Sequence, residues 1–129
     1  MGKGRISKIV GKIDKKITDE YNIPEYENQN IVQYMDLYMH VLKHIPEFES
    51  IDSYNNAVLK IDEIIAKPDF VYYEKKKNSL HYFKEIDEDV CVIVKLNLRK
   101  NKDNSVSTIY PVNKNKIEKL KENKYIINR

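Results

Sequence analysis

The sequence is poor in cysteine and has no long apolar run, and each shortage excludes a class of protein. Cys91 is the single cysteine among 129 residues, so an intramolecular disulfide is impossible and a cysteine-based zinc module is not expected. No apolar stretch approaches the roughly 18 residues that a bilayer-spanning helix requires. The basic N-terminus spaces its isoleucines as a helix does and lacks a continuous apolar segment. We therefore expect no signal peptide, no membrane association and a cytoplasmic protein.

Short motifs that identify common enzyme classes are also missing. The sequence contains no P-loop, no GxGxxG, no GxSxG and no HExxH. We therefore expect no cofactor of the kinds that these motifs bind. The net charge of +3, with 33% charged residues, is mildly basic and permits a polyanionic partner without requiring one.

The length of the chain predicts one domain, residues 1–129. Isoleucines and a valine at helical spacing predict an amphipathic helix over residues 5–21, which must end near Pro24. We take residues 1–24 as an N-terminal helical extension of a core that spans residues 31–118.

Two further helical segments are expected before Pro68. The pattern in SIDSYNNAVLKIDEIIAK predicts a helix with Ser50 or Asp52 as its N-cap. The preceding segment, NIVQYMDLYMHVLKHI, is helical from Leu37 onward and ends at Pro46. Its first residues, IVQYM, fit either a short strand or a helix, because periodicity alone does not separate the two.

After Pro68 the spacing of apolar residues changes from about 3.6 to 2, which indicates strands. Four strands are predicted, with the sequences FVYYE, LHYFKEI, VCVIVKLNL and VSTIYPV. The fold class is therefore α+β: N-terminal helices packed on a four-stranded antiparallel sheet, with a short C-terminal helical tail over NKNKIEKLKENKYI.

Alternation along the last two predicted strands assigns their side chains to faces of the sheet. In the third strand, one apolar face should contact the helices; it consists of Val90, Val92, Val94, Leu96 and Leu98. In the fourth strand, Val106, Thr108 and Tyr110 should share one face. A sheet that is covered on one face leaves the other face able to receive a ligand.

His40 and His44 lie one helical turn apart in HVLKHIPEF, next to the end of a helix. Three interpretations compete: a metal site, an acid/base pair, or packing with one imidazole buried. A zinc site needs a third ligand, and His81 and Cys91 are the only soft candidates, so we expect no metal. Acid/base catalysis suits histidine because its reference pKa lies near 6.5.

RNA cleavage is one reaction that such a pair can perform. It needs a base for the 2′-hydroxyl, an acid for the leaving oxygen, and cations or polar donors for the charged transition state. Lysine, threonine and tyrosine suit this last task. Each of them, taken alone, equally fits an ordinary strand position.

The order of the motifs resembles a known family. HVLKHIPEF, PDFVYY, LHYFKEID, VCVIVKLN and VSTIYPV follow one another as in the barnase–EndoU–colicin–RelE superfamily of metal-independent ribonucleases, in its phage- and mobile-element-encoded branch. The likeness covers about residues 31–118. It implies helices packed on a four-stranded antiparallel sheet.

The resemblance also implies a set of catalytic residues. The helix histidines of the family match His40 and His44, the lysine of the second strand matches Lys84, and the hydroxyl pair of the last strand matches Thr108 and Tyr110. His44 is the residue on which the interpretation depends most.

Three further cations are candidates for binding the substrate. Lys43 stands where family members often have arginine, which keeps the charge and loses the bidentate fork. Lys95 projects from the neighbouring strand, and either it or Arg99 could supply the charge if Lys84 points away from the histidines.

The sequence therefore predicts a toxin-type or phage-associated endoribonuclease that acts on RNA by metal-independent transesterification and leaves a 2′,3′-cyclic phosphate. Such an enzyme implies an antitoxin or immunity protein as a partner. The alternative is a non-catalytic binding or inhibitor protein of a phage or other mobile element, because such folds can lose catalysis and persist as binding modules.

Overall fold

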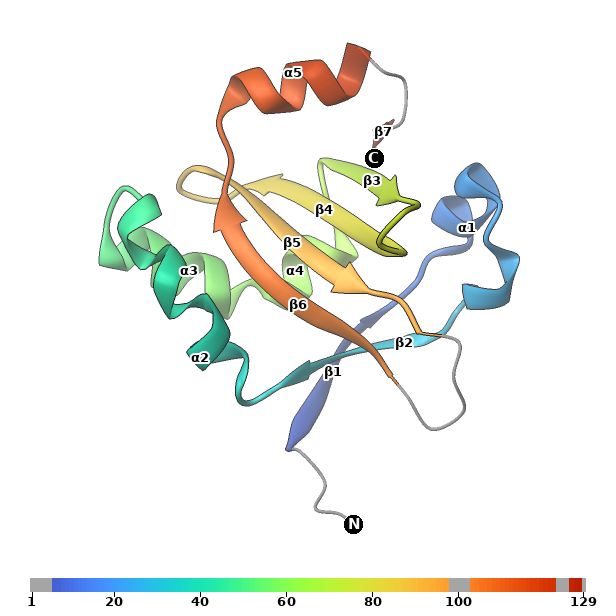
Figure 1. Cartoon of the computed structure of the whole chain (residues 1–129), viewed down its shortest axis with the longest axis horizontal. Coiled ribbons are helices and arrows are strands. Elements are labelled where there is room, and N and C mark those ends of the chain that lie inside the picture. The colour runs from blue at the N-terminus through green and yellow to red at the C-terminus, as the bar shows by residue number, and fades with distance from the viewer. Residues whose placement is uncertain (1–5, 98–102, 123–125, 129) are drawn as a thin grey trace.

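The computed structural model describes residues 6–97, 103–122 and 126–128 (Figure 1). The elements follow one another as β1 (Ser7–Lys12), α1 (Lys15–Tyr21), η1 (Pro24–Tyr26), β2 (Asn30–Tyr34), α2 (Leu37–Val41), η2 (Leu42–Glu47), α3 (Ile51–Leu59), α4 (Ile61–Ala66), β3 (Phe70–Glu74), β4 (Ser79–Glu85), β5 (Asp89–Lys95), β6 (Asn104–Pro111), α5 (Lys114–Glu122) and β7 (Ile126–Asn128). None of the helices within these ranges is long and apolar enough to cross a membrane.

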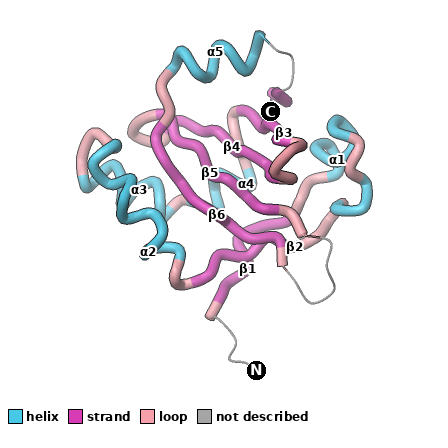
Figure 2. The backbone as a smooth tube through the Cα atoms, viewed as in Figure 1, coloured by secondary structure: helices cyan, strands magenta, loops and turns pink. Residues whose placement is uncertain are grey.

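The sheet is mixed and larger than the sequence predicts. In the described part of the chain, seven strands pair in the order β1-β2-β6-β5-β4-β3-β7. β2 pairs with β6 in parallel, Ile31 beside Asn104 and Val32 beside Ser105, and the remaining pairs are antiparallel. The predicted four-stranded antiparallel sheet is therefore wrong in strand number and in direction. The α+β class and the four predicted strands, now β3 to β6, are correct (Figure 2).

The N-terminal segment explains part of this difference. Ser7–Lys12 is a strand, so the predicted helix over residues 5–21 is correct only for α1. β-Branched isoleucines suit a strand. Gly11 also lets β1 approach α4 closely, since a Cβ at this position would stand 2.8 Å from Cγ2 of Ile65. Asp14 then begins α1 by accepting a hydrogen bond from the backbone N–H of Lys16.

The helix predicted after Ser50 is present at these residues, but it is divided into α3 and α4. Ser50 is its N-cap, and its hydroxyl accepts a hydrogen bond from the backbone N–H of Ser53 at 3.0 Å. Lys60 separates α3 from α4. The expected stripe is buried in both pieces and includes Tyr54, Val58, Ile61, Ile64 and Ile65.

Two apolar clusters lie on opposite faces of the sheet. Helices α1 to α4 cover one face, and their core includes the side chains predicted for the third strand: Val90, Val92, Val94 and Leu96. Leu98 lies outside the described residues. On the other face, a smaller cluster gathers Phe83, Cys91 and Ile117 of α5. Figure 1 shows α4 behind the central strands and α5 across one end of them, so much of this second face is left uncovered.

A bulge in β6 decides which side chains reach the uncovered face. Ile93 pairs with Thr108 and Val94 pairs with Val106, so Ser107 is an extra residue in β6. Val106 and Ile109 therefore both point into the helix-covered core. The prediction that Val106 shares a face with Thr108 and Tyr110 is wrong for this reason, because a bulge breaks strict alternation.

Different segments lie beside the two ends of β6. Its first residues pair with β2, and β2 then diverges into α2, whose Leu37 and Val41 are buried in the core. The next segment, η2, passes beside the last part of β6. Pro46 lies inside η2, so the turn predicted to stop at Pro46 continues to Glu47. This path carries His44 to the end of β6.

Candidate active site

His44 and Tyr110 meet where η2 passes the end of β6. Their ring centroids are 5.8 Å apart, and the two ring planes are tilted by 37°. The imidazole is partly accessible, with 18% of the side chain exposed. Two residues that lie 66 positions apart in the sequence thus form one contact at the rim of the uncovered face.

Glu47 fixes the orientation of the His44 ring. Its Oε2 lies 2.9 Å from Nδ1 of His44. An ionised carboxylate only accepts hydrogen bonds, so this contact places a proton on Nδ1. Nε2 is then the nitrogen that can take a proton from another molecule, or return one when the ring is charged.

The Tyr110 hydroxyl lies among several polar groups. Nζ of Lys116 is 3.3 Å from the phenol oxygen and 5.3 Å from the ring centroid. Burial raises the pKa of Tyr110, and the neighbouring Cys91 raises it further. The phenol is therefore neutral near pH 7 and suited to donating a hydrogen bond. Burial also raises the pKa of the Cys91 thiol to about 12, which makes Cys91 a poor nucleophile.

Thr108 lies two residues before Tyr110, on the same face of β6. Its hydroxyl oxygen is covered and has no hydrogen-bond partner among the described residues. A buried polar atom without a partner costs about 1–3 kcal/mol. A group that could satisfy this hydroxyl would gain that free energy.

His81 also lies on this face, although the sequence indicates it only as a candidate metal ligand. It pairs with Ile93, which in turn pairs with Thr108, so the three side chains form a row across β4, β5 and β6. Burial lowers the pKa of His81 to about 4; Lys116 and Lys77 lower it as well, against the effect of Glu74. Strand alternation combined with the register of two antiparallel hairpins could have placed it here.

Lys84 does not join the cluster. Alternation in β4 places it on the face of Leu80 and Tyr82, which belong to the helix-covered core. Its Nζ donates to the carbonyl oxygen of Lys67 at 2.8 Å and lies 3.8 Å from a carboxylate oxygen of Asp69. The ammonium is thus held behind the sheet, away from His44 and Tyr110.

The other predicted cations are scattered. Lys95 lies on the uncovered face, where its Nζ donates to the carbonyl oxygen of Lys77 at 2.7 Å. It also lines a groove of about 260 Å³ beside the bulge, together with Tyr34, Asp36, Leu37, Ser105, Val106 and Ser107. Lys43 is exposed on η2. The backbone of His40 belongs to α2, but its side chain and the whole of Arg99 lie outside the described residues.

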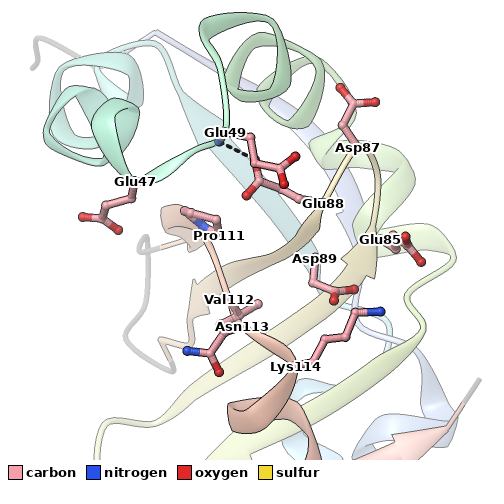
Figure 3. Close-up of a pocket in the computed structure, with 10 residues that line it drawn as sticks. All are labelled: Glu47, Glu49, Glu85, Asp87, Glu88, Asp89, Pro111, Val112, Asn113 and Lys114. Carbon is pink, nitrogen blue, oxygen red and sulfur yellow. Dashed lines mark hydrogen bonds between the residues drawn. The ribbon is translucent and has the colours of Figure 1, made fainter.

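A cavity that adjoins this site through Glu47 is acidic (Figure 3). It measures about 530 Å³ and is lined by Glu47, Glu49, Glu85, Asp87, Glu88, Asp89, Pro111, Val112, Asn113 and Lys114. Glu88 accepts hydrogen bonds from the backbone of Glu49 and the hydroxyl of Ser53. So many carboxylates repel a polyanion, which makes this cavity unsuitable for a nucleic-acid backbone.

The carboxylates of this cavity do not form a metal centre. Across the described ranges, no group of three or more His, Cys, Asp or Glu side chains is arranged to hold a metal ion.

Comparison with known proteins identifies one family. The family described as phage-Barnase-EndoU-ColicinE5/D-RelE like nuclease3 matches residues 7–119, a span that includes β1, α1 and the beginning of α5. Neither the curated proteins nor the solved structures contain a significant match.

Proposed function

The chain belongs to the phage-Barnase-EndoU-ColicinE5/D-RelE like nuclease3 family, and from this premise we propose that it is an endoribonuclease that works without a metal. Membership makes a nucleic acid the expected substrate. The choice of RNA and the site at His44 are our proposal. The observation that supports it best is the contact of a partly exposed, carboxylate-oriented imidazole with a tyrosine on the uncovered face.

The proposed reaction is a transesterification at one phosphodiester. Nε2 of His44 takes the proton of the 2′-hydroxyl, the 2′ oxygen forms a bond to phosphorus, and the bond from phosphorus to the 5′ oxygen breaks. The 5′ oxygen leaves as a hydroxyl after receiving a proton, a task we assign to His40. The products are a 2′,3′-cyclic phosphate and a 5′-hydroxyl end.

Tyr110 and Thr108 act on the phosphate in this scheme. The raised pKa of Tyr110 keeps the phenol protonated, so it can donate a hydrogen bond to a non-bridging oxygen. We assign the second hydrogen bond to the unpartnered Thr108 hydroxyl, which the substrate reaches by displacing the side chains that cover it. Because an active ribonuclease harms the cell that makes it, we further propose a toxin-type or phage-associated role.

The proposed function is tested by the chemistry of the products. A labelled single-stranded RNA should yield fragments that end in a 2′,3′-cyclic phosphate, and the same sequence with 2′-O-methyl groups should stay intact. The rate should be unchanged in EDTA, because imidazole proton transfer needs no ion. Binding of RNA without any cleavage would favour a non-catalytic binding protein. Loss of cleavage in EDTA that returns with zinc or magnesium would contradict the metal-free reaction.

A further inference from the structure

A lysine outside the predicted site residues, Lys116, contacts Tyr110. Lys116 is in the first turn of α5, and its backbone N–H donates to the Asn113 side chain at 2.9 Å, which fixes the start of the helix. Ile117, the next residue, is buried against the cluster of Phe83 and Cys91. These two anchors hold α5 on the sheet and set the direction of Lys116.

We propose that Lys116 is the cation that binds the scissile phosphate, an inference that rests on the function proposed for His44 and Tyr110. Its Nζ lies 3.3 Å from the Tyr110 hydroxyl, which is a neutral group and leaves the positive charge of the ammonium uncompensated. In the part of the chain that the structure describes, no carboxylate forms an ion pair with Lys116. A phosphate placed beside Tyr110 would supply the missing negative charge.

The electrostatic influence of Lys116 extends over the uncovered face. Its charge adds to the effect of burial, which lowers the pKa of His81 on β4, and it opposes the effect of burial, which raises the pKa of Cys91 on β5. The side chain itself is exposed, so an approaching substrate can reach it. One ammonium thus acts on side chains of both β4 and β5 on this face.

Two other lysines are less suitable for this position. The Lys84 ammonium is occupied behind the sheet by the Lys67 carbonyl and Asp69. Lys95 shares the correct face, but it lies four residues from Cys91, the strand partner of Tyr110. At about 3.3 Å per residue this is roughly 13 Å, so Lys95 could reach only a different phosphate.

The test compares two lysine variants on two substrates. Lys116→Gln removes the charge at the proposed site, and Lys84→Gln removes a charge of the same kind behind the sheet. Cleavage is measured on single-stranded RNA, and binding is measured on the uncleavable 2′-O-methyl oligonucleotide at several salt concentrations. The second substrate reports phosphate contacts even in the absence of catalysis.

Lys116→Gln should cleave more slowly by on the order of 10²–10³-fold, the loss typical of removing one preorganised transition-state contact. It should also bind the 2′-O-methyl oligonucleotide more weakly, with a salt slope lower by about 0.7 for one lost phosphate contact. Lys84→Gln should cleave and bind as the wild type does. Lys116→Arg, which keeps the charge, should retain most of the binding.

The outcomes separate this inference from the proposed function. A wild type that does not cleave RNA, with weaker binding in Lys116→Gln, would refute the ribonuclease and retain Lys116 as a phosphate-binding residue. Unchanged binding and cleavage in Lys116→Gln would overturn the assignment of Lys116. Equal losses in Lys84→Gln, or equal losses in Lys116→Arg, would also overturn it, because the effect would then not come from a local charge.

Discussion

At the scale of single residues, His44 has two neighbours that define its chemistry. Glu47 holds Nδ1, and the ring rests on Tyr110, so Nε2 is the nitrogen available to a substrate. His81 differs because its ring is largely buried, and in the described structure its side chain forms a hydrogen bond of 3.3 Å with the Ser79 hydroxyl. His81 is thus suited to the neutral state.

Burial of His81 should make stability depend on pH. Its pKa falls from 6.5 to about 4, so between these values the unfolded chain binds a proton that the folded chain does not. Stability therefore decreases as the pH falls through this window. After allowance for partial solvent exposure, we expect urea unfolding to show a loss of about 1–2 kcal/mol from pH 7 to pH 5 that His81→Gln does not show. Equal pH dependence of wild type and His81→Gln would contradict the buried, neutral state.

At the scale of elements, short segments are where sequence patterns fail. Isoleucines near the N-terminus fit a helical stripe, but residues 7–12 form a strand that is stabilised by pairing with β2. The parallel pairing of β2 with β6 joins residues more than 70 positions apart, and local periodicity carries no information about it. The bulge at Ser107 likewise depends on how β6 curves over the core.

The close approach of β1 to α4 gives a test at this scale. Gly11→Ala would place a methyl group 2.8 Å from Cγ2 of Ile65, which is buried. We expect a loss of about 1–3 kcal/mol in the free energy of unfolding, the usual cost of overpacking. In an Ile65→Ala background the same substitution should cost clearly less, since Cγ2 is gone. If Gly11→Ala lowered the free energy of unfolding equally in both backgrounds, a clash between residue 11 and Ile65 would not be the cause of the loss.

At the scale of the whole molecule, the sequence predicts the faces of the last strand better than it predicts which candidate residues lie together. Alternation correctly places Thr108 and Tyr110 on one face, and family likeness selects His44, which the structure sets against Tyr110. Lys84 matches the family motif, yet alternation along β4 places its side chain on the helix-covered face of the sheet. Lys116 belongs to a helix whose docking depends on tertiary contacts through Ile117, so its position could not be read from the chain.

Acidic and basic side chains also gather in different parts of the molecule. The acidic cavity beside the β4–β5 turn excludes a nucleic-acid backbone, while Lys95 and Lys116 belong to the uncovered face. In the proposed function, a strand of RNA would therefore cross β5 and β6 and pass His44.

The central claim is that His44 performs proton transfer, and the most direct measurement compares cleavage and thermal unfolding of wild type and His44→Ala. We expect a loss of cleavage on the order of 10²–10⁴-fold, as is usual for the removal of one proton-transfer group. The free energy of unfolding should fall by only about 1 kcal/mol, the size typical of a point substitution, because the partly exposed imidazole loses its contacts with Glu47 and Tyr110. A His44→Ala variant that melts several degrees lower and cleaves RNA as fast as the wild type would contradict the account.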